Sequence, residues 1–217
     1  MIVYIETNFV IEVVREQEQH ADALAVIELA EKGQIELAFP NFVLAECFDN
    51  VLRIHNERND LHNSLKKTLG ELKRSEPHKQ VMVDLGPVIS VLQDSQKREL
   101  AILHSTLNRL INIGKCLEVK MDGIKQAEFY QKNLALDPKD SIIFSTIIDD
   151  LKGRSVGEKK CFLSRDTKAF GRRTSGSKAF GSDDDRRIKA ELETYNCEYK
   201  GSFYGGLMFI QHQLQNN

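Results

Sequence analysis

The feature that most constrains the fold is the alternation of short segments predicted to be strands with longer stretches predicted to be helical. The predicted strands lie at residues 2–5, a continuous apolar run, and at 35–39, 117–119, 160–164 and 198–200. A parallel pair of strands needs a crossover between them, and crossover helices cover both faces of the resulting sheet. The sequence therefore predicts an α/β fold with a central parallel sheet between two layers of helices.

The middle of the chain is predicted to be helical over an unusual length. A helix begins at Phe42, and helical periodicity continues, with breaks at two prolines, to about Ile113. We interpret residues 55–115 as a helical insertion in a single domain that spans residues 1–217. An apolar stripe on this insertion either packs inside a helical hairpin or forms a partner-binding face. The stripe consists of Leu100, Leu103, Leu107, Leu110 and Ile111.

Charge and cysteine spacing exclude several classes of protein. The formal net charge is -2, so binding of nucleic acid through bulk positive charge is excluded, although a local basic patch is compatible with it. The four cysteines are far apart and lack the paired spacing of a zinc site. Residues 1–6 lack the basic region of a secretory signal, and no apolar run approaches the ~18 residues of a membrane span. We expect a cytoplasmic protein with no membrane partner.

Four acidic residues occupy positions that a parallel sheet would bring to one edge. Glu6 and Asp166 each come just after a predicted strand, and the crevice of an open parallel sheet lies beyond these strand ends. Asp140 lies in the first turn of the helix before the strand at 160–164. Glu46 lies one turn into the helix that follows the strand at 35–39.

Carboxylates that converge in this way repel one another unless a cation neutralises them. Mg²⁺ and Mn²⁺ prefer oxygen ligands, so a divalent-metal site is the economical explanation of the four acids. Such a site supports phosphodiester hydrolysis, because a metal lowers the pKa of water and stabilises the charge that develops on phosphate.

With these acids in this order, the sequence resembles the PIN-domain nucleases. The resemblance is carried by residues 3–11 (VYIETNFVI), 44–47 (LAEC), 136–145 (LDPKDSIIFS) and 162–168 (FLSRDTK). It covers about residues 1–50 and 120–205, outside the helical insertion. The first acid is Glu6, where the family usually has Asp, and the extra methylene moves the carboxylate outward by roughly one C–C bond.

The resemblance implies a fold, a reaction and a set of partners. It implies a Rossmann-like or flavodoxin-like sheet and a Mg²⁺- or Mn²⁺-dependent endoribonuclease in which Glu6, Glu46, Asp140 and Asp166 hold the metal. RNA is the implied substrate, with DNA left open. A homodimer, and an antitoxin or other regulatory protein of the kind that controls toxin-like members, are further partners that it leaves open.

Three polar residues beside the acids have a structural and a functional interpretation. Asp137 precedes Pro138 as a helix N-cap should, and it is also a candidate to support the metal ligands. Asn8 and Ser164 could orient the ligands by hydrogen bonds, although Asn8 could instead cap a helix together with Thr7.

A loop at residues 167–185 is rich in glycine, serine and basic residues. Basic side chains in and next to it are candidates for contacts with phosphates, and a solvated loop is the alternative. The candidates are Arg165, Lys168, Arg172 and Arg173. Phe170 and Phe180 could stack on single-stranded bases or anchor the loop.

Two other functions fit parts of the sequence. A catalytically silent nucleic-acid-binding or scaffold protein is suggested by Glu6 and by the long insertion. A phosphotransfer enzyme that forms an aspartyl-phosphate is disfavoured, because the acid after the first strand is Glu6 and no DxD pattern is present there.

Overall fold

The computed structural model describes residues 1–78, 86–166, 169–170 and 183–216. Within these ranges five strands form one sheet, and every neighbouring pair is parallel. The strands are β1 (Ile2–Ile5), β2 (Glu36–Pro40), β3 (Lys115–Leu117), β4 (Lys160–Leu163) and β5 (Cys197–Lys200). Their spatial order is β3-β2-β1-β4-β5. The predicted α/β fold with a central parallel sheet is confirmed.

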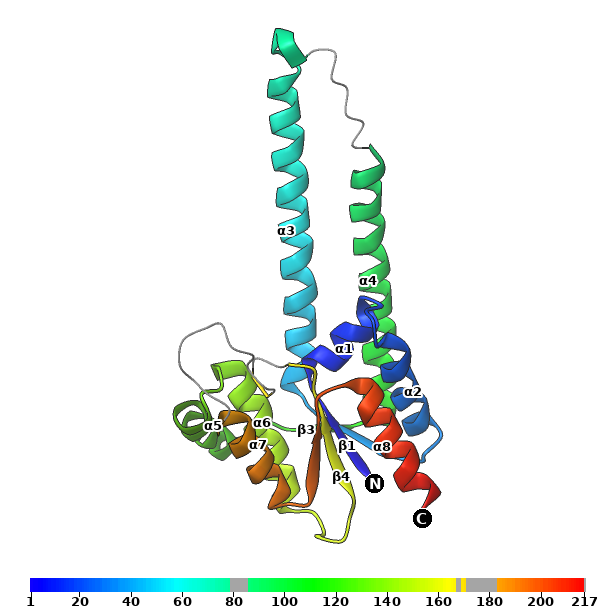
Figure 1. Ribbon diagram of the computed structural model, residues 1–217, viewed down its shortest axis with the longest axis vertical. Helices are drawn as coiled ribbons and strands as arrows, with labels where there is room; N and C mark the ends of the chain where they lie inside the picture. The colour runs from blue at the N-terminus through cyan, green and yellow to red at the C-terminus, as the bar shows by residue number, and fades with distance from the viewer. Residues whose placement is uncertain (79–85, 167–168, 171–182, 217) are drawn as a thin grey trace.

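Helices cover both faces of the sheet (Figure 1). One layer consists of α5 (Met121–Leu134), α6 (Pro138–Lys152) and α7 (Asp183–Glu193). The other layer consists of α1 (Thr7–Val14), α2 (His20–Glu31) and α8 (Phe203–Gln215). The helix α6 contacts β2 and β3, whereas α8 contacts β4 and β5. The sheet therefore lies between two helical layers, as predicted.

The central strand β1 and its neighbour β4 are buried along their whole length. All four residues of β1 and all four of β4 are buried, which explains why a strand covered on both faces appears as a continuous apolar run. Lys160 is the charged exception in β4. Its ammonium donates to the carbonyls of Ser155 at 2.6 Å and Tyr195 at 3.0 Å, so the buried charge is hydrogen-bonded.

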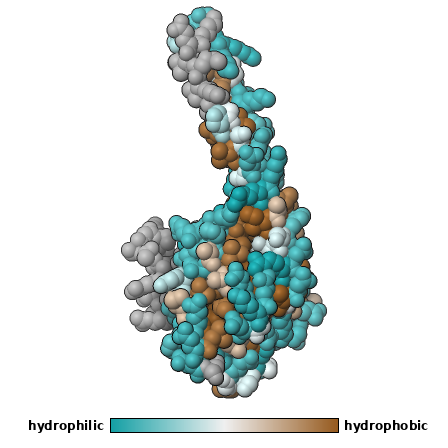
Figure 2. Space-filling model, turned by 90° about the vertical axis from the view of Figure 1, so that its right-hand side faces the viewer, coloured by the Kyte–Doolittle hydropathy of each residue, from teal (hydrophilic) through white to brown (hydrophobic). Residues whose placement is uncertain are grey.

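Two long helices extend away from the sheet as a hairpin (Figure 1). They are α3 (Phe42–Leu72) and α4 (Gly86–Ile113), and the short 3-10 helix η1 (Glu76–His78) follows α3. The expected insertion at 55–115 corresponds to most of this hairpin, but α3 itself begins at Phe42 in the body. Figure 2 shows that apolar side chains reach the surface of the hairpin, and Leu61 and Val91 are among the exposed ones.

The apolar stripe of α4 contributes to the core of the body. Leu103, Leu107 and Leu110 are buried in the same cluster as the strands, whereas Leu100 and Ile111 are exposed. The helix α4 contacts α1 and α2 in addition to α3. The stripe therefore packs against the sheet-covering helices as well as inside the hairpin.

Several boundaries differ from those expected. The strand expected at 117–119 lies at Lys115–Leu117. The sequence alone predicts a last helix that starts after Gly206, but this helix begins at Phe203, with Ser202 as its N-cap. Cys47, Cys161 and Cys197 are buried, as apolar fillers would be, but Cys116 is exposed. None of the described helices is long and apolar enough to cross a membrane.

Candidate functional site

The candidate site lies at the carboxyl ends of β1, the central strand of the sheet, and its neighbour β4. The last pair in their register is Ile5 with Leu163, so Glu6 and Ser164 leave the sheet side by side. The strand order changes direction here, because β2 and β3 extend to one side and β4 and β5 to the other. Open α/β sheets bind ligands at such a switch point.

Glu6 is both the first acid of the site and the N-cap of α1. Its side chain is buried, and its Oε2 accepts a 2.7 Å hydrogen bond from the backbone N–H of Asn8. The expected cap at Thr7 and Asn8 was wrong by one residue. The other oxygen, Oε1, is buried and has no hydrogen-bond partner among the described residues. A buried carboxylate oxygen in this state costs roughly 1–3 kcal/mol unless a proton or an ion satisfies it.

Glu46 reaches the same edge from the second turn of α3. The Thr7 hydroxyl donates to Glu46 Oε2, which links the acid to the first turn of α1. The ammonium of Lys139 lies 3.7 Å from Glu46 Oε1 and 3.2 Å from Asp49 Oδ2. Glu46 is therefore held between α1 and the start of α6.

Asp137 and Asp140 form the start of α6. Asp137 is the N-cap, and its Oδ1 accepts from the backbone N–H groups of Lys139 and Asp140, both at 2.9 Å. Pro138 occupies the first turn, where its missing N–H costs nothing. The cap fixes the first turn of α6 and therefore the position of Asp140. The predicted capping role of Asp137 is confirmed.

Asp166 follows β4 and is oriented from several sides. Its Oδ2 accepts from Asn8 Nδ2 at 3.4 Å, and its Oδ1 accepts from the backbone N–H of Ala169 at 2.9 Å. Its own N–H donates to the buried Ser164 hydroxyl at 3.0 Å. Asn8 and Ser164 therefore contact the residue that they were predicted to orient.

Burial and mutual repulsion shift the titration of two of these acids. The pKa of Glu6 is raised to about 8, first by burial and further by the charges of Asp166 and Asp140, against opposing hydrogen bonds. The pKa of Asp140 is also raised to about 8, again first by burial and then by the neighbouring carboxylates of Asp137, Asp166 and Glu46. Asp140 and Asp166 therefore lie within electrostatic reach of Glu6, and Asp166 and Glu46 lie within electrostatic reach of Asp140.

The donor chemistry of this cluster fits a hard divalent cation. All of its candidate ligands are carboxylates, the oxygen donors that Mg²⁺ and Mn²⁺ prefer, and Glu6 Oε1 is a buried oxygen without a hydrogen-bond partner in the described part of the chain. No three His, Cys, Asp or Glu side chains of the described residues are spaced to hold a metal ion as they stand. A cation would therefore compete with the hydrogen bonds that now hold these carboxylates.

Sequence reasoning missed Glu12, which is buried on α1 and organises the neighbouring loop. Its Oε1 accepts from Arg165 Nη1 at 2.7 Å and from the backbone N–H of Gln19 at 2.6 Å. It lies one turn after Asn8, so successive turns of α1 hold Asp166 and Arg165. The available signal was a single charge in an apolar run, FVIEVV at residues 9–14, a pattern that also surrounds Glu46 in VLAECF at residues 43–48.

Of the basic residues predicted to contact phosphates, only Arg165 lies among the described residues. Arg165 pairs with Glu12 at 2.7 Å and with Glu18 at 3.2 Å, so two carboxylates already neutralise its charge. Its role in nucleic-acid binding stays a prediction. Lys168, Arg172 and Arg173 lie outside the described residues.

Of the two aromatic residues that were candidates for base stacking, one lies among the described residues. Phe170 is buried, with its ring centroid 5.2 Å from that of Phe162 and 6.1 Å from that of Phe144. Phe170 is part of the core, so the base-stacking alternative is wrong for this residue. Phe180 lies outside the described residues.

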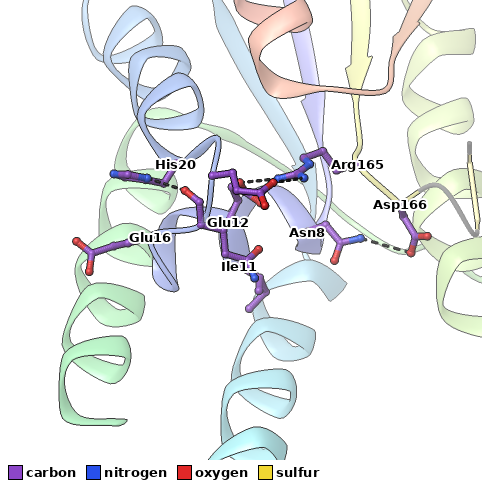
Figure 3. A pocket seen from close by; sticks show the side chains of 9 residues that line it. Asn8, Ile11, Glu12, Glu16, His20, Arg165 and Asp166 are labelled. Carbon is purple, nitrogen blue, oxygen red and sulfur yellow. Dashed lines mark hydrogen bonds and ion pairs between the residues drawn. The ribbon is translucent and has the colours of Figure 1, made fainter. Parts of the chain in front are cut away.

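A cavity of about 870 Å³ adjoins the acids and runs along α1 (Figure 3). Asn8 and Asp166 line its end next to the acid cluster, and Glu16 and His20 line it at the far end of α1. Ile11 and the Arg165–Glu12 ion pair lie between these ends. The site is therefore larger than the acid cluster and has room for a group next to it.

Comparison with protein families gives one match. A family model described as PIN domain matches residues 3–170. The match begins in β1, includes all four acids and runs through the hairpin that the sequence motifs had left out. No curated protein and no solved structure matches the chain significantly.

Proposed function

The chain belongs to the PIN-domain family, and we propose that it is a divalent-metal-dependent endoribonuclease with Glu6, Glu46, Asp140 and Asp166 as its metal-binding acids. PIN domains are usually nucleases. The observation that carries the proposal is the placement of these acids at the carboxyl ends of β1 and β4, where the buried Glu6 Oε1 has no hydrogen-bond partner among the described residues. Neighbouring carboxylates also contribute to the raised pKa values of Glu6 and Asp140.

The cation that fits this cluster is Mg²⁺ or Mn²⁺. When bound, it supplies a Lewis acid that lowers the pKa of water and offsets negative charge on phosphate. Glu6 offers its buried Oε1, and Glu46, Asp140 and Asp166 offer the remaining carboxylates. The neighbouring residues position these acids: Asn8 and Ser164 hold Asp166, Thr7 holds Glu46, and Asp137 fixes the turn that carries Asp140.

The proposed substrate is single-stranded or structured RNA. The cluster can cleave within a chain, because the cavity along α1 is open and extends beyond the acids. DNA of the same sequence is the natural comparison, since the chemistry of the acids does not by itself distinguish the two backbones. A second copy of the chain and an antitoxin or other regulatory protein stay predictions.

The experiment that tests this function compares cleavage of matched RNA and DNA strands by the purified chain in Mn²⁺. The double variant Asp140→Asn, Asp166→Asn removes two charges from the cluster and should lower cleavage of RNA roughly 100-fold or more. The control is Asp60→Asn, Asp122→Asn, which removes the same charges from exposed helical positions and should cleave at the wild-type rate. Equal cleavage by the wild type and the Asp140–Asp166 variant would reject the assignment.

One observation favours a second function, a catalytically silent nucleic-acid-binding or scaffold protein. Glu6 is engaged as the cap of α1, and its raised pKa favours the neutral form near pH 7. Calorimetric titration distinguishes the two functions. Retained RNA binding without any Mn²⁺ binding at millimolar concentrations would favour the silent protein, and saturable Mn²⁺ binding would favour the nuclease.

A further inference from the structure

The cavity along α1 is part of the same surface as the acid cluster, but its chemistry is different. Asn8 and Asp166 line its end beside the acids, and from there it passes over Ile11 to the turn that follows α1 (Figure 3). Glu16 adopts a left-handed backbone conformation in that turn, with φ of 48°, which reverses the chain towards α2. At about 870 Å³, the cavity is large enough for a nucleoside.

The charge of the described lining disfavours a phosphate in this cavity. It contains the carboxylates of Glu12, Glu16, Glu18 and Asp166 against the guanidinium of Arg165, and a second guanidinium, that of Arg98, pairs with Glu16 from outside the lining. Negative charges therefore outnumber positive ones, and a phosphate would be repelled. An uncharged group that offers N–H donors to carboxylates fits this lining better, and in an RNA strand that group is a nucleobase.

A cavity that presents both a guanidinium and carboxylates should bind some nucleobases better than others. Guanine presents two adjacent N–H donors on its Watson–Crick edge, which match a carboxylate, and two acceptors at O6 and N7, which match a guanidinium. Uracil presents one N–H between two carbonyl oxygens, which a carboxylate repels. We propose that this cavity is a guanine-binding subsite that places a guanosine beside the scissile phosphate, an inference that rests on the proposed nuclease function.

The residues that would contact the base can adapt to it. Glu18 is 86% exposed and bonds Arg165 at only 3.2 Å, so it can exchange that contact for a base. The bond from Arg165 to Glu12 is shorter, at 2.7 Å, and Glu12 is buried. Because a guanidinium has five N–H donors, Arg165 can keep Glu12 and still donate to O6 and N7. Ile11 provides apolar lining for the face of the ring.

Binding is tested without catalysis by titrating the metal-free chain with the nucleosides guanosine and uridine, which differ only in the base and carry no phosphate. Backbone amide signals of residues 16–20 should shift with guanosine at a roughly tenfold lower concentration than with uridine. Glu18→Gln should remove most of that difference, whereas Glu193→Gln, an exposed acid on α7, should retain it. Equal binding of the two nucleosides, or shifts confined to other residues, would overturn the inference.

A cleavage experiment can distinguish a failure of the guanine subsite from a failure of the proposed nuclease function. A uridine-rich RNA with one guanosine should be cut beside that guanosine, and the preference should weaken roughly tenfold in Glu18→Gln. Cleavage at every position alike would overturn the guanine subsite and leave the nuclease standing. Selective binding of guanosine by a chain that cuts no RNA would support the subsite and contradict the nuclease.

Discussion

Asn8 Nδ2 donates to Asp166 Oδ2 at 3.4 Å, although 158 residues separate the two along the chain. The contact joins the first turn of α1 to the residue that follows β4, across the centre of the sheet. At this length the hydrogen bond is weak, so its contribution to stability is below about 1 kcal/mol. Its main consequence is the orientation of the Asp166 carboxylate.

Asn8→Ala should therefore change activity more than stability. We expect RNA cleavage to fall roughly tenfold, because groups that orient a ligating side chain typically affect activity by 10–100-fold. The urea midpoint should move little. The measurement is single-turnover cleavage beside a denaturation curve, with the exposed Asn63→Ala of α3 as the control. A large loss of stability together with unchanged cleavage would show that the contact is only structural.

The two acids that hold Arg165 should differ in their effect on stability. Glu12 is buried, so Glu12→Gln leaves Arg165 without its shorter ion pair and should cost about 1–3 kcal/mol of unfolding free energy. Glu18 is exposed, and Glu18→Gln should cost less than about 1 kcal/mol. Urea denaturation of the two variants measures both. Similar losses in the two variants would contradict the distinction between them.

Variants of Asp137 can separate its role as the N-cap of α6 from the effect of its negative charge on Asp140. Asp137→Asn keeps a side-chain oxygen for the N–H groups of Lys139 and Asp140, so stability should be close to that of the wild type, whereas Asp137→Ala should lose about 1 kcal/mol. Both variants remove a charge that raises the pKa of Asp140, so that pKa should fall in each. Carboxyl NMR titration follows the pKa. An unchanged Asp140 pKa in both variants would contradict the electrostatic coupling.

The metal-free chain should lose stability as the pH rises. The pKa of Glu6 is raised from 4.5 to about 8 in the folded chain, so the folded state binds this proton more tightly than the unfolded state does. The resulting stabilisation is fully present below about pH 4.5 and is lost as the pH rises towards 8. Thermal unfolding in EDTA from about pH 5 to 8.5 measures it. Glu6→Gln should make the profile shallower, with the remaining slope due to the raised pKa of Asp140, and an equally steep profile in that variant would contradict the assignment to Glu6.

Much of the fold could be predicted because local pattern and packing agree. The strands covered on both faces appear as apolar runs, and Asp137 followed by Pro138 identifies the start of α6. The first residues of α1 and α8 were harder to predict, because several neighbouring residues could each act as the N-cap. In α1 the carboxylate of Glu6 is the cap, and no local rule favours Glu6 over Thr7 or Asn8.

The long-range part of the site was harder to derive from the sequence. The positions of the four acids relative to strand ends were sufficient to group them, since parallel strands end at one edge. The burial of Glu12 and its pairing with Arg165 depend on how α1 lies beside the residues after β4, and no local sequence pattern encodes that contact. The same is true of the stripe of α4, where only the packed structure separates buried Leu103 from exposed Leu100.

The most direct test of the central claim is the rate of RNA cleavage as Mn²⁺ is added to the metal-free chain. Cleavage should be absent in EDTA, rise to saturation with Mn²⁺, and fall roughly 100-fold or more in Asp140→Asn, Asp166→Asn at every Mn²⁺ concentration. Cleavage that is independent of Mn²⁺, or that is equal in the wild type and this double variant, would contradict a metal-dependent nuclease site at these acids.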